Sequence, residues 1–354
     1  MSSAALPSLI GMTLDQLTGV VLGGGMPKFV GKQLADWLYK KKVTDFSQMI
    51  NISQKNREWL SANYVIGREK PVEKMKSADG TVKYLYKAGD GKNVESVLIP
   101  DRERATLCVS SQIGCRMNCY FCATGRLGFK GNLSSAQIMN QILESSEISS
   151  GGEKDNERLT NIVFMGMGEP LDNMSALLDV IEILTASWGL AWSPTRITVS
   201  TVGKLPQLKE LLEKTKVHVA ISLHTADMSE RGDLMPAQKA FPMSSVIKVL
   251  KGFDFSHQRR LSFEYIMWRG VNDDIAHAEQ VVKLLSGLDC RVNLIRFHKI
   301  PGVELLPASE ERMMMFRNYL NSKGIIATIR ASRGEDIMAA CGMLAGTKCD
   351  SSKK

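Results

Sequence analysis

Three cysteines within eight consecutive positions are the residues of this chain best suited to chemistry. Cys115, Cys119 and Cys122 have the spacing CxxxCxxC. Thiols this close together either bind a metal or are open to oxidation. A structural zinc site takes four protein ligands, usually from paired CxxC or Cys/His sets, and no second pair is present. Three thiolates on a four-iron cube would leave one iron open, so the spacing favours an iron–sulfur cluster and leaves zinc as the alternative.

A glycine-rich turn and several strand ends are the next candidates. Gly168 and Glu169 stand in Phe-Met-Gly-Met-Gly-Glu-Pro. Glycine lets the backbone approach a ligand, and the carboxylate can accept hydrogen bonds from an ammonium group. The residues that end the next two predicted strands are Ser200, Ser222, Leu223 and His224. Taken singly, each of these is no more than a tight turn or a strand-end cap.

Six strand–helix units are expected to position these residues. Strands are predicted at 105–110, 161–167, 196–201, 217–223, 261–268 and 291–297, with an extra strand at 325–330. Helices are predicted at 136–148, 175–186, 205–214, 244–253, 275–286 and 310–322. This alternation indicates a parallel sheet with helices outside it, and right-handed crossovers then give a barrel or part-barrel. Six units are fewer than the eight of a closed TIM barrel, and chemistry in such folds gathers at the carboxyl ends of the strands.

The region before the barrel has a different pattern. Residues 14–21, 31–40 and 54–63 place apolar residues at helical spacing. A hairpin follows, with strands at 81–87 and 94–99 around the turn Asp90-Gly91. Glu95 shares a strand face with apolar residues, which is unusual unless its side chain turns to water at the strand edge. The first region is locally basic, and its lysines are Lys28, Lys32, Lys40, Lys41 and Lys42. Taken alone, these lysines are most simply interpreted as the solvated face of a helix.

Composition limits the class of protein. The 354 residues are 44% hydrophobic, which is enough for one large domain and a smaller one. The formal net charge of +8 suits a polyanionic partner such as nucleic acid, although charge alone is weak evidence. The absence of a long apolar run or a secretory leader, together with an odd number of cysteines, predicts a protein of the reducing cytoplasm.

The cysteine spacing followed by a strand–helix part-barrel resembles the radical S-adenosylmethionine (SAM) superfamily. Four motifs together are similar to its RlmN/Cfr family of RNA-methylating enzymes, over roughly residues 12–346: Thr-Leu-Cys108-Val-Ser-Ser-Gln-Ile-Gly-Cys115, Phe-Met-Gly-Met-Gly-Glu-Pro, Asn293-Leu-Ile-Arg and Thr328-Ile-Arg-Ala-Ser-Arg-Gly-Glu-Asp-Ile-Met-Ala-Ala-Cys341-Gly. The resemblance implies an α/β fold, namely a partial (β/α)6 barrel with an N-terminal helical accessory domain and a β-hairpin. The expected parts are a basic RNA-binding domain (1–75), a hairpin with Glu95 (76–103), the barrel (104–331) and a C-terminal segment with Cys341 (332–354).

The resemblance also implies a role for each candidate. Cys115, Cys119 and Cys122 would hold a [4Fe–4S] cluster whose open iron binds SAM. The expected SAM contacts are Gly168, Glu169, Ser200, Ser222, Leu223, His224 and His298. Cys341 would be methylated first and would carry the carbon to adenine, after which Cys108 would resolve the protein–RNA crosslink as a disulfide. Glu95 would accept the proton.

Several alternatives stay open at this point. Many family members have Asn where His298 stands, so His298 can also be a satisfied strand-end histidine. Cysteines among Ala and Gly, as Cys108 and Cys341 are, are more often small buried hydrophobes, and Cys290 and Cys349 are assigned to that class.

The implied reaction is methylation of adenine C2 in 23S ribosomal RNA and in some transfer RNAs, with two SAM consumed. C8 methylation of the same ribosomal adenosine is the first alternative. A non-catalytic, zinc-stabilised RNA-binding protein is the second. A flavodoxin-type electron donor and a monomeric state are expected by analogy.

Overall fold

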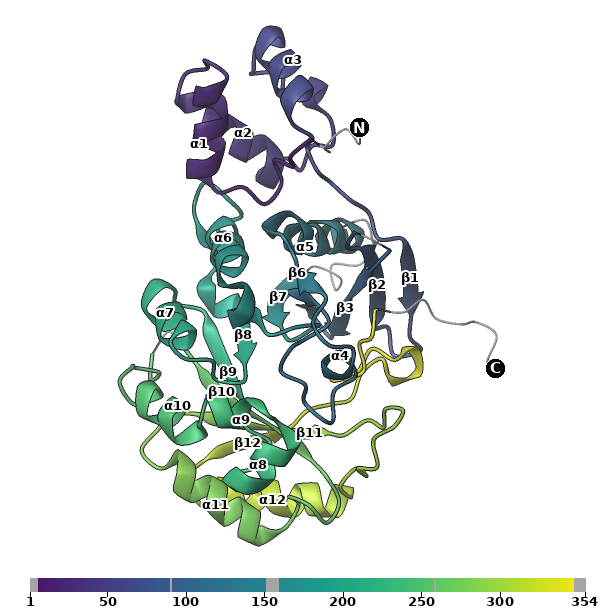
Figure 1. The fold of residues 1–354 in the computed structure, drawn as a ribbon, viewed down its shortest axis with the longest axis vertical. Helices are drawn as coiled ribbons and strands as arrows, with labels where there is room; N and C mark the ends of the chain where they lie inside the picture. Colours follow the sequence, from purple (N-terminus) through teal and green to yellow (C-terminus); the bar gives the residue numbers. More distant parts are fainter. Residues whose placement is uncertain (1–5, 90, 151–158, 258, 347–354) are drawn as a thin grey trace.

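The molecule consists of a small group of N-terminal helices and a larger α/β body (Figure 1). The computed structural model describes residues 6–89, 91–150, 159–257 and 259–346. Asp90 of the predicted turn therefore lies outside the described residues. None of the described helices has both the length and the apolar character that a bilayer span requires.

One open sheet runs through the body in the order β1-β2-β3-β4-β7-β8-β9-β10-β11-β12. The strands β1 to β4 are antiparallel neighbours, and from β4 to β12 each strand pairs in parallel with the next. Their bounds are β1 (Glu73–Lys76), β2 (Val82–Lys87), β3 (Asn93–Asp101), β4 (Arg104–Cys108), β7 (Leu159–Phe164), β8 (Ile197–Thr201), β9 (His218–Ser222), β10 (Leu261–Met267), β11 (Arg291–Arg296) and β12 (Ile326–Ile329). Every predicted strand is thus confirmed, whereas β1 was not predicted.

Six helices connect the successive parallel strands, as the alternation predicts. They are α5 (Ser135–Ser150), α6 (Met174–Thr185), α7 (Gln207–Lys214), α10 (Met243–Leu250), α11 (Ile275–Leu285) and α12 (Glu310–Ser322). The structure adds short elements that no periodic pattern predicts, because each is too short to show one: β5 (Gln112–Ile113), α4 (Ala123–Arg126), β6 (Gly131–Asn132), α8 (Met228–Leu234) and α9 (Ala237–Ala240).

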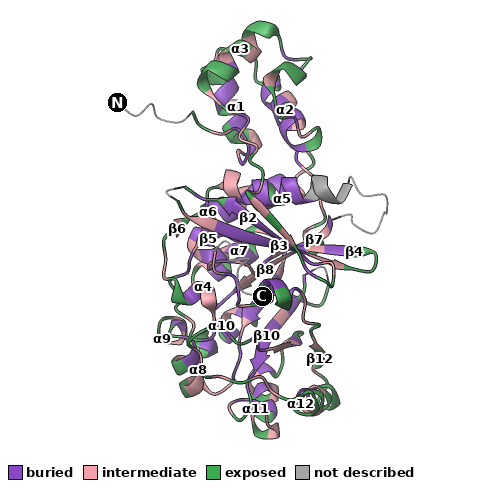
Figure 2. Ribbon diagram, turned by 90° about the vertical axis from the view of Figure 1, so that its right-hand side faces the viewer, coloured by how far each residue is buried: buried purple, intermediate pink, exposed green. Residues whose placement is uncertain are grey.

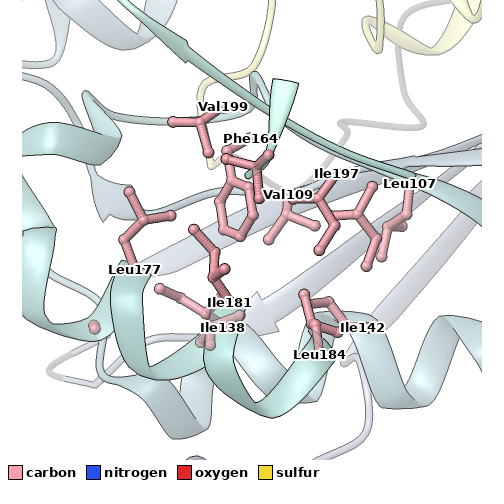
Figure 3. Packing of buried hydrophobic residues seen from close by; sticks show 14 of the residues in the cluster. Leu107, Val109, Ile138, Ile142, Phe164, Leu177, Ile181, Leu184, Ile197 and Val199 are labelled. Carbon is pink, nitrogen blue, oxygen red and sulfur yellow. The ribbon is translucent and has the colours of Figure 1, made fainter. Parts of the chain in front are cut away.

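The core lies between the sheet and these helices (Figure 3). Helix α6 buries Leu177, Ile181 and Leu184, whose spacing of three and four residues places them on one face of the helix. That face packs against Phe164 of β7 and Val199 of β8, both fully buried. The packing fixes where the carboxyl ends of the strands lie, and hence the loops that follow them.

The N-terminal helices α1 (Leu14–Gly23), α2 (Phe29–Ala35) and α3 (Gln54–Asn63) stand on α5 (Figure 2). Helix α2 continues as a π-helical turn over Asp36–Lys40, so the predicted helix at 31–40 is confirmed with an irregular last turn. A buried ion pair between Arg68 and Glu144 of α5 joins the two parts. Asn140 of α5 adds a hydrogen bond to the carbonyl oxygen of Gly67 at 2.8 Å.

Candidate active site

The cysteine loop between β5 and α4 is held from two directions. Tyr120 N donates to Leu234 O at the end of α8 across 2.9 Å. Ala123 N donates to Gly342 O across 2.8 Å. The loop therefore connects the strand ends of the sheet to the C-terminal segment that carries Cys341, which Figure 1 shows in yellow beside α4.

The thiols of this loop lie near enough to affect one another. Burial raises the pKa of Cys115, Cys119 and Cys122, and the charges of Cys122 and Cys115 raise that of Cys119 further. Thiolates buried this close together need positive charge, which the irons of a cluster supply, so the donor set fits an iron–sulfur cluster. No three His, Cys, Asp or Glu side chains in the described ranges are grouped as ligands of one metal ion. A four-iron cluster takes one thiolate per iron and therefore spaces its ligands more widely.

The glycine-rich turn after β7 is tied to the residues that precede the cysteines. Gly168 has φ +101°, and a Cβ there would lie 2.5 Å from Gln112 Cβ, so this position requires glycine. The Glu169 carboxylate accepts from Leu171 N at 3.1 Å and from Val202 N at 3.0 Å. Burial is the main reason that the pKa of Glu169 rises to about 7. Lone pairs remain on both oxygens, and these could accept from an ammonium group.

The predicted residues at the carboxyl ends of β8 and β9 come together at the same edge of the sheet. Ser200 and Ser222 are half-buried, and Leu223 is fully buried. His224 has φ +62°, and its Nδ1 accepts from Ile266 N at 3.1 Å. Burial lowers the pKa of His224 to about 3, so the imidazole is neutral and its Nε2 carries the proton.

The two remote cysteines approach each other. Burial raises the pKa of Cys108 to about 12, and the charge of Cys341 contributes to the rise. Burial also raises the pKa of Cys341, where Arg330 acts against the charges of Glu264 and Cys122. Both thiols are free. The structure thus brings Cys341 near both Cys108 and the cysteine loop.

Glu95 faces inward. It is 1% exposed, so the alternative of a strand-edge carboxylate turned to water is wrong. Its Oε1 lies 3.0 Å from Lys83 Nζ, and its Oε2 accepts from Ala345 N and Gly346 N at 2.8 Å each. The carboxylate therefore fastens the C-terminal segment a few residues after Cys341.

His298 contacts the C-terminal segment as well. Its Nδ1 lies 3.3 Å from Glu335 Oε1, and its Nε2 lies 3.2 Å from Ser332 Oγ. These contacts are what a satisfied strand-end histidine makes, and its contact with SAM stays a prediction. Cys290 is buried in the main core, as assigned, and Cys349 lies outside the described residues.

Some residues of the site were not identified from the sequence. Asp172 forms ion pairs with Lys204 and with Arg116 of the cysteine loop. Gln112 accepts from the backbone N–H of Glu169 at 2.9 Å and so joins two motifs. Lys83 is buried in β2, and its place in the sequence Val-Lys-Tyr-Leu-Tyr-Lys, among mostly apolar residues, is a signal that could have identified it.

Comparisons with known proteins identify the family of this chain. "Probable dual-specificity RNA methyltransferase RlmN" of Bacteroides thetaiotaomicron is 55% identical over 346 residues, which cover 98% of each chain. "Dual-specificity RNA methyltransferase RlmN" of Campylobacter lari is 40% identical over 96% of this chain and 97% of its own. This chain belongs to the RlmN family.

Family models and a solved structure extend the assignment. Residues 8–66 match the ribosomal RNA large subunit methyltransferase N-terminal domain, and residues 109–283 match the radical SAM superfamily. A radical SAM methyltransferase from Sphaerobacter thermophilus has a TM-score of 0.89 and 35% identity, over 96% of this chain and all of that one. The predicted radical-SAM part-barrel with a helical N-terminal domain is therefore confirmed. As a radical SAM enzyme of the RlmN family, the chain uses a [4Fe–4S] cluster and SAM.

Proposed function

We propose that this RlmN-family chain methylates C2 of an adenosine in 23S ribosomal RNA and in some transfer RNAs. Its relatives are named dual-specificity RNA methyltransferases. The observation that carries the proposal is the position of Cys341, since the carbonyl oxygen of the next residue, Gly342, accepts from Ala123 N, next to Cys122, at 2.8 Å. The charge of Cys341 also raises the pKa of Cys108. A thiol beside both the cysteine loop and a second thiol is what transfer through an S-methylcysteine requires.

Each residue has one task in this scheme. The bound cluster and SAM supply a methyl group and, with one electron, a carbon-centred radical. Cys341 would take a methyl group from one SAM, and that S-methyl group would lose a hydrogen atom to the radical derived from a second SAM. The resulting carbon radical would add to adenine C2, a position without the lone pair that ordinary methylation needs. After the radical adduct had returned one electron to the cluster and lost the C2 proton, the Cys108 thiolate would attack the Cys341 sulfur. The C–S bond would break with its electron pair on the methylene carbon, which would take a proton to become the methyl group, and a Cys108–Cys341 disulfide would remain. Glu95, held against the Cys341 segment, accepts the proton that leaves C2.

The cofactors take the remaining predicted residues. We assign the cluster to the thiolates of Cys115, Cys119 and Cys122. The same edge of the sheet supplies the proposed SAM contacts, which are Gly168, Glu169, Ser200, Ser222, Leu223, His224 and His298. His298 is the weakest member of this set, because both of its ring nitrogens already contact residues 332–335.

The N-terminal helices supply the proposed RNA surface. Lys28 and Lys32 are exposed at the start of α2, and the Phe29 ring between them is 64% exposed. Cations bind phosphates, and an exposed aromatic ring can stack on a base. This combination favours an RNA contact over a merely solvated helix face.

We further propose four functional parts and a set of partners. Residues 1–75 bind RNA, 76–103 hold Glu95, 104–331 carry the cofactors and 332–354 carry Cys341. The chain would act as a monomer in the reducing cytoplasm, where its thiols stay reduced. A flavodoxin-type protein would supply the electron.

Variants of single cysteines test the function. Anaerobically reconstituted wild-type protein should convert adenosine in RNA to 2-methyladenosine, measured by nucleoside mass spectrometry. Cys341→Ala should give no product, and Cys108→Ala should accumulate a covalent protein–RNA adduct that is visible on a denaturing gel. Cys290→Ala, in the core away from the site, is the matched control and should retain activity.

Other results of these experiments would support the alternative functions or change the mechanism. An 8-methyl product would reassign the reaction to C8. Protein that carries one zinc and no iron would indicate the RNA-binding alternative. Clean turnover by Cys108→Ala would remove Cys108 from the mechanism.

A further inference from the structure

Arg231 of α8 is a buried cation with neutral partners. It is 0% exposed. Its guanidinium donates to Leu223 O at 3.3 Å, to Ser222 O at 2.9 Å, to Val202 O at 3.2 Å and to Gln238 Oε1 at 2.6 Å. Three of these acceptors are backbone carbonyls and the fourth is an amide, so each guanidinium nitrogen has an acceptor, but none of these four partners carries a compensating charge.

A buried charge without a counter-charge is costly. Transfer of an ion from water into the protein interior costs several kcal/mol unless the ion is paired. Burial lowers the pKa of Arg231 to about 10, which still leaves the side chain charged at neutral pH. Within the described part of the chain, the charge that acts in the opposite direction is that of Cys119. The fold therefore keeps a positive charge beside one thiol of the cysteine loop.

The surroundings of Arg231 place it against the cluster site. The last residue of α8, Leu234, accepts the backbone hydrogen bond of Tyr120 in the cysteine loop at 2.9 Å. Leu234 also belongs to the apolar cluster against which Cys119 and Cys122 pack. The same guanidinium holds the carbonyl ends of β8 and β9. The Arg231 side chain thus connects the proposed SAM contacts at the ends of β8 and β9 with the cysteine loop.

We propose that Arg231 is the counter-charge of the iron–sulfur cluster and raises its reduction potential. Reduction adds one electron to the cluster from a one-electron donor, with no bond formed or broken. The added negative charge is stabilised by a fixed cation in a site from which water is excluded. Arg231 acts through the cluster, so it is a positioning and tuning residue.

This inference rests on one part of the proposed function, namely that a cluster is bound at the three cysteines. The test is an anaerobic redox titration of reconstituted protein with dithionite as the reductant, followed by electron paramagnetic resonance. Arg231→Gln removes the charge, whereas Arg231→Lys keeps it and loses the fork geometry. At a fixed solution potential, the ratio of reduced to oxidised cluster should fall about tenfold in Arg231→Gln, equivalent to 59 mV for a one-electron couple.

A second variant leaves Arg231 itself unchanged. Gln238→Glu leaves every donor of Arg231 with an acceptor and adds a carboxylate at its Nη1, so it should also lower the ratio. Lys239→Gln removes a charge from the adjacent exposed position and is the matched control. Screening by water predicts a change of less than about twofold for this control.

The outcomes separate the alternatives. A purely structural Arg231 would lower the melting temperature of both Arg231 variants and leave the potential of their loaded fraction unchanged. The inference would be overturned if the reduction potential of the cluster in Gln238→Glu, or in iron-loaded Arg231→Gln, equalled that of the wild type. If Arg231→Gln takes up no iron, Gln238→Glu alone decides. Wild-type protein that binds no iron would instead contradict the cluster and the proposed function.

Discussion

The pair of Glu95 and Lys83 is buried on both sides, with side chains 1% and 7% exposed. Removal of one member of such a pair leaves an uncompensated charge in the interior. The two backbone N–H groups of Ala345 and Gly346 add to the cost, since they also donate to Glu95. A stability role of Glu95 can therefore be measured separately from its proposed proton-accepting role.

Glu95→Gln should lower the free energy of unfolding by about 3 kcal/mol, because Lys83 is left without its counter-charge. The double variant Glu95→Gln/Lys83→Met should recover at least half of that loss in urea denaturation. Glu310→Gln is the control, because its ion pair with Arg296 is on the surface and is worth less than about 1 kcal/mol. Equal losses in Glu95→Gln and Glu310→Gln would contradict the buried-pair account.

His224 makes stability depend on pH. Its pKa falls from 6.5 to about 3 on folding, because burial penalises the charged ring. The unfolded chain therefore binds the proton more readily, and stability present above pH 6.5 is lost as the pH falls. Between pH 6.5 and pH 5 the loss should be about 2 kcal/mol.

His224→Asn should remove this dependence, since Asn tolerates positive φ and keeps an acceptor for Ile266 N. Urea unfolding of both proteins at the two pH values measures the difference between them. Parallel pH profiles for wild type and variant would show that His224 does not titrate as described.

At the scale of elements, the C-terminal segment is fastened by the turn between β1 and β2. Asp336 accepts from Ser77 Oγ at 2.6 Å and from Ala78 N at 3.1 Å. Asp79 accepts from Gly334 N at 2.9 Å. The turn therefore holds the segment on the N-terminal side of Cys341, and Glu95 holds it on the other side.

Asp336→Ala should loosen this fastening, because two donors lose their acceptor. We expect amide hydrogen exchange over 334–346 to accelerate about tenfold, as a local opening becomes easier by about 1.4 kcal/mol. Methylation of Cys341 should slow in parallel, measured by mass spectrometry of the peptide. Glu304→Ala, in the loop before α12, is the control and should change neither rate.

The prediction of elements from the sequence succeeded where they were long. The six connecting helices and their strands show clear periods, since each buries one face. The strand β1 alternates only between half-buried and exposed residues, so its sequence Glu-Lys-Met-Lys carries no apolar signal. The seven residues of helix α8 likewise show no apolar period in the sequence, although this helix carries Arg231.

At the scale of the whole molecule, the basic N-terminal helices stand at one end and α10 lies in the body below them (Figure 1). Lys28→Gln/Lys32→Gln should weaken RNA binding and reduce its salt dependence by about 0.7–0.9 in log–log slope for each phosphate that is no longer neutralised. Filter binding at several salt concentrations measures the slope. Lys248→Gln on α10 changes the net charge at a distance from that surface and should leave the slope nearly unchanged. Equal effects from both surfaces would mean that net charge alone attracts RNA.

The sequence by itself indicated metal binding by the three thiols, with an iron–sulfur cluster favoured over zinc, and it determined the order of the elements. Three thiols at CxxxCxxC spacing are neighbours in any loop, and repeated apolar periods identify strands and helices without knowledge of their partners. Local spacing is sufficient for both inferences, because each depends on residues within a few positions of one another.

Only the tertiary structure decided which distant residues meet. Cys108 and Cys341 approach each other, and Glu95 reaches Ala345 and Gly346, because the parallel crossovers bring the end of the chain back beside the hairpin. That Arg231 has only uncharged hydrogen-bond acceptors among the described residues could not be predicted either, since compensation of a charge depends on everything that surrounds it in space.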